Sequence, residues 1–203
     1  MYFMFTFSTC NKEGCRRHAL SWCNTCFEHL TNMDSYLLTL QQALKTQTNF
    51  QDLNLNRMTL GGLDLRGKNF DGCDFSGIHL TQSQMDEAHF THCFFDFSRF
   101  ESCSFQRINA LFCSFSGSVF DFCQWEGSEL LHVNFNGIRA QETKFSESDL
   151  YFSCFVGAKL NKIELMDCNL KKVSFERSVL NDVDFQYSNY EEADFTNAKG
   201  APL

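Results

Sequence analysis

The chain repeats its chemical pattern every five residues. From Phe50 to Phe195, thirty successive fifth positions carry apolar side chains, with no insertion or deletion between them. An α-helix would spread a period of five around its circumference, and a flat strand would send alternate members of the series to opposite faces. A backbone that turns once in every five residues is the arrangement that keeps all thirty side chains inside.

Four such turns close a coil of 20 residues, and coils stacked about 4.8 Å apart can exchange backbone hydrogen bonds with their neighbours. Positions two residues before each large apolar one are mostly small or β-branched, as at Cys73, Ile78 and Ser83. The other three positions of each repeat hold nearly all the charged side chains and must face water. Residues 20 apart share a row, and one internal row has seven phenylalanines in succession: Phe75, Phe95, Phe115, Phe135, Phe155, Phe175 and Phe195.

Individual repeats combine a small residue, an aspartate, a large apolar residue and two polar residues. Cys73-Asp74-Phe75-Ser76-Gly77 and Ala193-Asp194-Phe195-Thr196-Asn197 are examples. On these motifs, residues 48–199 resemble the pentapeptide-repeat family, which implies an all-β fold, a right-handed quadrilateral β-helix. Eight glycines occupy the last position of a repeat, where a tight turn with positive φ would favour them: Gly62, Gly67, Gly72, Gly77, Gly117, Gly127, Gly137 and Gly157.

The segment before the repeats has a different chemistry. Four cysteines and two histidines between Cys10 and His29 follow the spacing C-x4-C-x2-H-x4-C-x2-C-x2-H, and such paired thiolate and imidazole ligands suit tetrahedral Zn²⁺. The segment also resembles small zinc motifs of the form C-x3-G-C followed by C-x2-H.

That resemblance implies Cys10, Cys15, Cys26 and His29 as ligands of a structural zinc ion. A set with Cys23 in place of His29 is the close alternative, and His18 is a third candidate. A head whose four thiols are buried without metal is the competing interpretation.

A helix is predicted after the cysteines, because apolar residues recur at spacings of three and four between Leu30 and Leu44. We expect it to cover the first coil, whose open sheet edge would otherwise promote aggregation. The predicted organisation is therefore a head and capping helix over residues 1–47, the β-helix over 48–199 and a short tail over 200–203.

The composition excludes several classes of function. The chain has 17 Lys and Arg against 25 Asp and Glu, a formal net charge of −8, which argues against direct binding of nucleic acid. No run of about 18 apolar residues is present, so we expect no membrane span. Eleven cysteines without a convincing secretory signal favour the cytoplasm as the location.

Sorting the charges by side of the predicted square reveals an asymmetry. One side holds eight carboxylates against Arg66, Arg107 and Lys144, a net charge of −5. We call it the acidic side and predict that it binds a protein partner with a basic surface; an ordinary solvated face is the alternative. Its carboxylates are Asp64, Asp86, Glu87, Glu126, Glu147, Glu164, Asp167 and Asp184.

The expected function is a non-enzymatic protein-protein interaction module, because no nucleophile-base arrangement or phosphate-binding loop stands out. The family resemblance raises an alternative, the regulation or protection of a type II topoisomerase such as DNA gyrase through DNA mimicry. Residues 48–203 carry a net charge of −9, whereas duplex DNA about 36 Å long carries roughly 21 negative charges. A zinc or redox sensor acting through the head is a further alternative.

Overall fold

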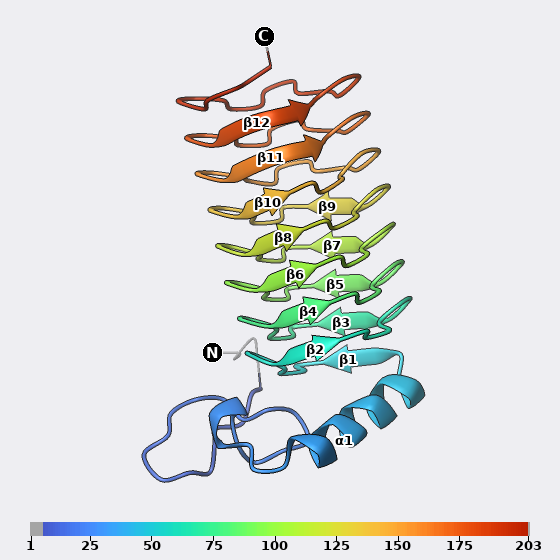
Figure 1. The fold of residues 1–203 in the computed structure, drawn as a ribbon, viewed down its shortest axis with the longest axis vertical. Coiled ribbons are helices and arrows are strands. Elements are labelled where there is room, and N and C mark those ends of the chain that lie inside the picture. The colour runs from blue at the N-terminus through green and yellow to red at the C-terminus, as the bar shows by residue number, and fades with distance from the viewer. Residues whose placement is uncertain (1–5, 203) are drawn as a thin grey trace.

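The computed structural model describes residues 6–202 as a parallel β-solenoid of about seven turns, with one short helix at its N-terminal end (Figure 1). The predicted quadrilateral β-helix is thereby confirmed. The division into a head over 1–47, repeats over 48–199 and a tail over 200–203 stays a prediction, and residues 1–5 and 203 lie outside the described part.

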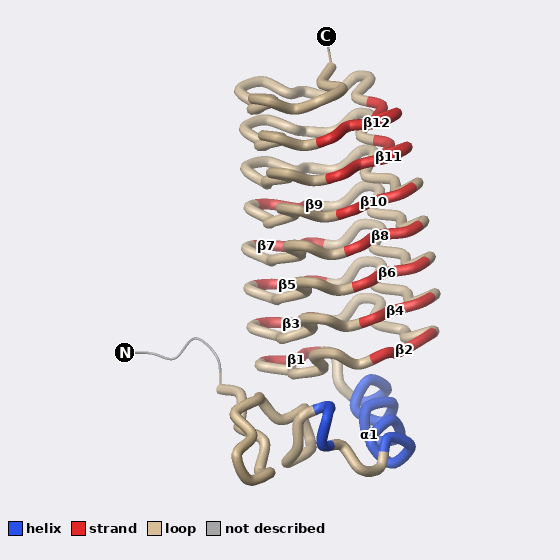
Figure 2. The backbone as a smooth tube through the Cα atoms, turned by 60° about the vertical axis from the view of Figure 1, so that its left-hand side comes forward, coloured by secondary structure: helices blue, strands red, loops and turns tan. Residues whose placement is uncertain are grey.

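Two of the four sides of the coil carry regular strands, each in parallel register with the strand 20 residues away (Figure 2). One sheet contains β1 (Asn49–Gln51), β3 (Asn69–Asp71), β5 (His89–Thr91), β7 (Asn109–Leu111) and β9 (Glu129–Leu131). The other sheet contains β2 (Thr59–Gly61), β4 (His79–Thr81), β6 (Arg99–Glu101), β8 (Val119–Asp121), β10 (Arg139–Gln141), β11 (Lys159–Glu164) and β12 (Val179–Asp184).

The other two sides pair through isolated parallel bridges that follow the same 20-residue spacing, such as Asp64 with Gln84 and Asn54 with Asp74. Backbone groups on all four sides therefore bond to the adjacent coil, which satisfies their hydrogen-bonding capacity.

The core is a set of stacked aromatic rows along the axis. The rings of Phe115 and Phe135 lie 5.3 Å apart at an angle of 13°, and both side chains are fully buried. Trp125 stacks on Phe105 at 3.9 Å in the row on the opposite side of the coil. Such offset stacking adds to the stabilisation that burial of the rings already provides.

The last position of each repeat forms the corner, and all eight glycines predicted there have φ between 61° and 68°. Non-glycine residues also occupy these corners with positive φ, for example Phe97 at 56°. Gly117 has a second reason to be glycine, because an added Cβ would lie 2.7 Å from the ring of Phe97. The corner geometry is thus set by the coil and tolerates side chains that project outward.

Helix α1 (Met33–Thr46) lies beneath the first coil, as predicted, but its buried face is rotated from the expected one (Figure 1). Tyr36, Leu40, Ala43 and Leu44 are its buried residues, whereas Met33 is 37 % exposed. Met33 belongs to the apolar series between Leu30 and Leu44 and is the member of that series that the structure leaves exposed, in the first turn of the helix.

Lys68 occupies an inward position of the first coils without burying its charge. Its Nζ donates to the backbone carbonyl of Gln47, the C-cap residue of α1, at 3.2 Å. The long side chain thus carries the ammonium outward and ties the coil to the end of the helix, where a cation is electrostatically favourable. Of the helices within residues 6–202, none has the length and apolar character needed to cross a bilayer.

Candidate metal centre and interaction faces

Two short loops build the head and bring its cysteines together. In the first, the backbone N–H of Cys15 donates to Lys12 across a turn in which Gly14 has φ of 75°. In the second, the N–H of Leu20 donates to Thr25, which places Cys26 directly before the short 3-10 helix η1 (Phe27–His29). His29 follows Cys26 by three residues, so both side chains project from the same side of this turn.

The four side chains that the zinc-motif resemblance implied as ligands converge on one point. Their candidate ligand atoms, the sulfurs of Cys10, Cys15 and Cys26 and a ring nitrogen of His29, all lie within 4.8 Å of one another. Nδ1 of His29 is 3.4 Å from the Cys10 sulfur and 3.5 Å from the Cys26 sulfur. The sulfurs of Cys15 and Cys26 are 3.9 Å apart. These residues could therefore hold a metal ion.

The distances agree with a tetrahedral ion at the centre. A Zn–S bond of about 2.3 Å implies tetrahedral edges of about 3.8 Å between sulfurs, and slightly less between sulfur and nitrogen. The other two candidates lie elsewhere: the Cys23 sulfur contacts the Thr25 hydroxyl at 3.1 Å, and the His18 ring packs 5.2 Å from Phe7. The geometry separates the Cys10, Cys15, Cys26 and His29 set from both alternatives.

The environment of the cluster changes the acidity of its thiols. Burial raises the pKa of Cys10, but backbone hydrogen bonds from Lys12 and Cys26, with His29 and Cys15 adding to them, lower it to about 6. The backbone of Arg17 acts to lower the pKa of Cys15, and burial together with the neighbouring sulfurs of Cys10 and Cys26 raises it overall. One thiolate is thus favoured where a cation would bind.

The thiols of the solenoid core are different. Cys73, Cys93 and Cys113 follow one another in an internal row, all fully buried or nearly so. The adjacent thiol of Cys93 and burial raise the pKa of Cys73, and burial raises that of Cys93. The raised pKa keeps the thiols of Cys73 and Cys93 protonated, and all three cysteines fill space in the core as small apolar side chains.

The head is attached to the open edge of the first coil through Asn54. Ser21 accepts from the Asn54 N–H with its hydroxyl at 2.8 Å and donates its own N–H to the Asn54 carbonyl at 3.0 Å. The Asn54 side chain donates to the carbonyl of Ala19 at 2.7 Å and is itself buried. Glu28 also binds Arg57 of the first coil at 2.8 Å. The backbone N–H and carbonyl of Asn54, which a preceding coil would otherwise bind, thus form their hydrogen bonds with the head.

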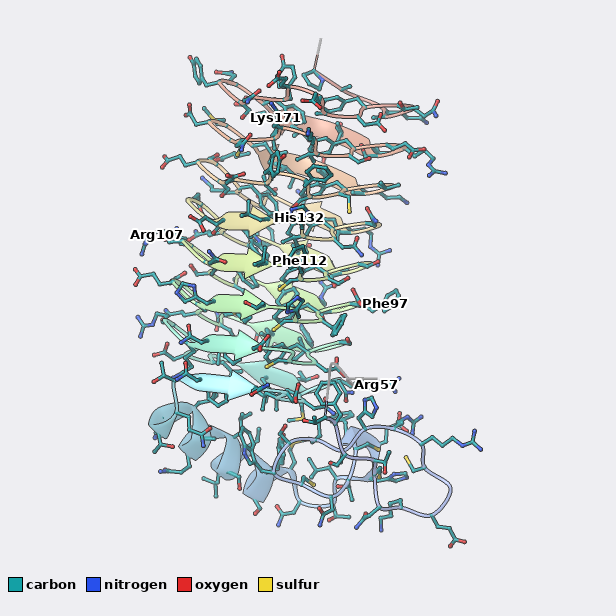
Figure 3. All side chains as sticks on the ribbon, turned by 180° about the vertical axis from the view of Figure 1, so that it is seen from behind. Arg57, Phe97, Arg107, Phe112, His132 and Lys171 are labelled. Atoms are coloured by element: carbon teal, nitrogen blue, oxygen red, sulfur yellow. The ribbon has the colours of Figure 1, made fainter. Side chains whose placement is uncertain are left out.

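The acidic side predicted from the sequence is one continuous side of the solenoid. Parallel bridges connect Asp64, Gln84, Ser104, Gln124, Lys144 and Glu164 in one row, and β12 continues it with Asp184. Corner positions with positive φ carry Glu87, Arg107, Glu147 and Asp167 along the edge of this side. Arg107 marks that edge in Figure 3.

All three cations of the acidic side are used in local ion pairs. Arg66 binds Asp64 at 2.8 Å, Arg107 binds Glu87 at 2.9 Å and Lys144 binds Glu164 at 3.1 Å. The remaining five carboxylates have no cation within 4 Å in the described part of the chain: Asp86, Glu126, Glu147, Asp167 and Asp184. The net charge of −5 therefore corresponds to five specific groups.

Sequence reasoning missed an exposed aromatic row at a different corner. His92, Phe112, His132 and Phe152 stack on one another with centroid distances of 5.6, 5.1 and 5.2 Å. We call this row the aromatic ridge. Figure 3 shows Phe112 and His132 one above the other, between the corners of Arg107 and Phe97. The ridge could have been found by comparing the corner positions that lie 20 residues apart, instead of inspecting those positions for glycine alone.

Comparisons with known proteins agree with this architecture. A family model described as pentapeptide repeats (8 copies) matches residues 48–85 and 69–107, and one described as a pentapeptide repeat region matches residues 118–195. A search of curated proteins finds no match.

Solved structures similar to this chain include three pentapeptide-type solenoids. A trypsin-treated QnrB1 variant, a plasmid-mediated fluoroquinolone resistance protein, has 18% identity and a TM-score of 0.45, covering 70% of this chain and 84% of that one. HetL, involved in heterocyst differentiation regulation in Nostoc sp. strain PCC 7120, has 14% identity and a TM-score of 0.33, with coverages of 79% and 92%.

The third is a pentapeptide repeat protein from the Arabidopsis thaliana thylakoid lumen, with 22% identity, a TM-score of 0.19 and coverages of 68% and 70%. The family assignment rests on the two family models and on the 20-residue register seen throughout the coil. The chain belongs to the pentapeptide-repeat family.

Proposed function

We propose that this protein is a non-enzymatic interaction module whose acidic side binds a protein partner with a basic surface. The observation that carries the proposal is the distribution of charge on that side. Its three cations form ion pairs within the same side, and five carboxylates of that side have no cation beside them and can bind a partner. A row of like charges on a rigid surface steers a cationic partner and fixes its orientation.

The rigidity comes from the coil itself. From Phe50 to Phe185 each repeat is anchored by a buried apolar side chain, and repeats inside the stack form hydrogen bonds to both neighbouring coils. The carboxylates are therefore held at fixed spacing, and binding orders little backbone.

We propose that the head holds a structural zinc ion through Cys10, Cys15, Cys26 and His29. The distances among the four ligand atoms and the lowered pKa of Cys10 support this assignment. When bound, the ion would supply the stability that so small a segment cannot obtain from its own apolar core. The chain's residues then act as a cap: Ser21 and Ala19 pair with Asn54 at the sheet edge.

Charge-changing variants test the acidic side. The probe is a fluorescent 15-residue peptide of Lys and Gln, whose binding is followed by anisotropy at several salt concentrations. We expect E126Q/D167N to weaken binding and to reduce its salt dependence. The control E176K changes the net charge by the same amount on another side, where Glu176 pairs with Arg177, and should bind as the wild type does. Equal affinity of both variants would contradict the proposal.

A type II topoisomerase stays the alternative partner raised by the family resemblance. The unbroken 20-residue register within residues 49–199 leaves no projecting loop of the kind that enzyme-protecting members use. A gyrase supercoiling assay in the presence of the inhibiting drug distinguishes the cases. Protection that E126Q/D167N abolishes and E176K retains would favour the topoisomerase, and absence of any effect at micromolar protein would remove it.

A further inference from the structure

The negative charge does not stop at the edge of the acidic side. Past the corner formed by Glu147 and Asp167, the adjacent side is the sheet of β1, β3, β5, β7 and β9, and Glu129 and Asp149 stand beside each other on it. Asn109 donates to Glu129 at 2.5 Å and Asn169 donates to Asp149 at 3.0 Å, so amides rather than cations contact both carboxylates. Two carboxylates therefore form the corner, and two more lie beside it on the adjacent sheet side.

The other half of this sheet side is apolar. Leu111 of β7 lies opposite Leu131 of β9, and Tyr151 follows in the next coil. All three are half-buried, and we call them the apolar shelf. The aromatic ridge borders the shelf, with Phe112 51 % and Phe152 47 % exposed. Apolar side chains that reach the surface together over three coils are a feature of binding sites.

Charged groups close the shelf at both ends. At one end, Nδ1 of His92 lies 3.7 Å from the Asp71 carboxylate. At the other, the Lys172 ammonium lies 5.3 Å from the Phe152 ring centre and pairs with Glu192 at 3.8 Å. Lys171, beside it, pairs with Glu191 at 2.8 Å. The apolar surface is thus limited to the coils of Leu111, Leu131 and Tyr151.

The spacing of these rows indicates the secondary structure of an occupant. Adjacent coils are about 4.8 Å apart, so the three rows of the shelf span about 9.6 Å. Residues i, i+4 and i+7 of an α-helix span about 10.5 Å along the helix axis, one per turn. Alternate residues of an extended strand are about 6.7 Å apart and would fall out of step after one coil.

We propose that the shelf and the aromatic ridge, together with the carboxylates of the adjoining corner, form a docking site for a basic amphipathic α-helix lying along the solenoid axis. Its apolar stripe contacts Leu111, Leu131 and Tyr151. Its Lys or Arg residues, on the flank of that stripe, face Glu129 and Asp149. The inference rests on the proposed function in taking the partner to be basic, and it adds the partner's secondary structure and its apolar row.

Peptides of matched composition test the site. The first is a 15-residue peptide of Leu and Lys arranged with helical periodicity, and the second contains the same residues in strict alternation. The third replaces each Leu of the first by Gln. We expect the helical Leu and Lys peptide to bind the full-length protein at least tenfold more tightly than either comparator, measured by anisotropy below the concentration at which the peptides self-associate.

Variants at the ridge locate the binding. F112N/F152N should remove the advantage of the helical peptide while leaving binding of the Gln and Lys peptide unchanged. Asn tolerates the positive φ of these corners, so the coil is preserved. The matched control is F97N/F122N, which removes two exposed phenylalanines from other corners and should bind all three peptides as the wild type does.

Each outcome decides one of the two proposals. Equal affinity for all three peptides, or a helical advantage that survives F112N/F152N, overturns the docking site and leaves the basic partner intact. Failure of E126Q/D167N to weaken any peptide overturns the basic partner. A concentration-dependent increase in the protein's own mass, lost in F112N/F152N, would show that a second copy of the chain covers the ridge, and would also overturn the docking site.

Discussion

The phenyl rings of Phe115 and Phe135 stack 5.3 Å apart although twenty residues separate them in the chain. This contact is the direct signature of a coil that closes after four repeats. Every surface row described above, including the acidic side and the aromatic ridge, depends on the same closure, because residues 20 apart are neighbours on the outside as well.

Removing one ring from the stacked core should lower the stability of the protein. F135A removes a fully buried ring, and we expect the free energy of unfolding to fall by about 3–5 kcal/mol, as is typical for large-to-small changes in a packed core. Urea denaturation measures the change. F122A, at an exposed corner, is the control and should alter stability by less than about 0.5 kcal/mol. Similar effects of the two variants would be inconsistent with the stacked core.

Metal content distinguishes the head's cysteines. Protein purified without chelator should contain one zinc ion per chain by elemental analysis. We expect C26S to lose it, because Cys26 contributes one of the converging sulfurs, and C23S to retain it, because the Cys23 sulfur contacts Thr25 instead. Loss of zinc from C23S with retention in C26S would reverse the ligand assignment, and absence of metal from the wild type would remove the zinc site.

Chelation separates a cap from a sensor. If the ion stabilises a cap, removing it should expose the amides of β1 and β2 to hydrogen exchange, because the first coil loses the head that covers its edge. If the head is a sensor, chelation should change the affinity of the acidic side for the Lys and Gln peptide while protection of the first coil persists. The two readouts are independent, so each interpretation can fail alone.

The contact between head and coil depends on Asn54. N54A removes the bond to the Ala19 carbonyl and should lower the free energy of unfolding by about 1–3 kcal/mol, because a buried acceptor loses its partner. Residues Leu20 to Cys26 should also exchange their amide hydrogens faster. N134A, on the same side in the middle of the solenoid, is the control. If N134A accelerated exchange in the head equally, the capping role of Asn54 would be excluded.

The Asp64 and Arg66 pair predicts a specific pH dependence. The hydrogen bond from Arg66 lowers the pKa of Asp64 from 3.8 to about 2. The resulting stabilisation is complete above pH 4 and is lost as the pH falls towards 2. Because both side chains are exposed, it amounts to less than about 1 kcal/mol. R66Q should raise the Asp64 pKa in an NMR titration, and R107Q should leave it unchanged. An unchanged Asp64 titration in R66Q would refute the pairing.

The five-residue period was sufficient to predict the coil, its core rows and the glycine corners, because each inward position is a local and repeated requirement. The head was harder, since its ligands come from two loops whose relative placement is set by turns at Gly14 and Trp22. Spacing alone left Cys23 and His18 open as candidates. The aromatic ridge was not predicted, because Phe112 and Phe152 occupy outward corner positions that become neighbours only through the 20-residue register of the coil.

The constant length of the coil has a consequence for changes in chain length. Removing one repeat of five residues from the middle of the solenoid keeps every large apolar side chain pointing inward, yet it turns all that follows by a quarter of a revolution. If the deletion lay between Glu126 and Asp167, the two carboxylates would no longer lie on the same side of the solenoid, although neither residue had been altered. The inward orientation of a side chain repeats every five residues, whereas its neighbours in the adjacent coils repeat every twenty, so a change in length alone would rearrange the surface that a partner contacts.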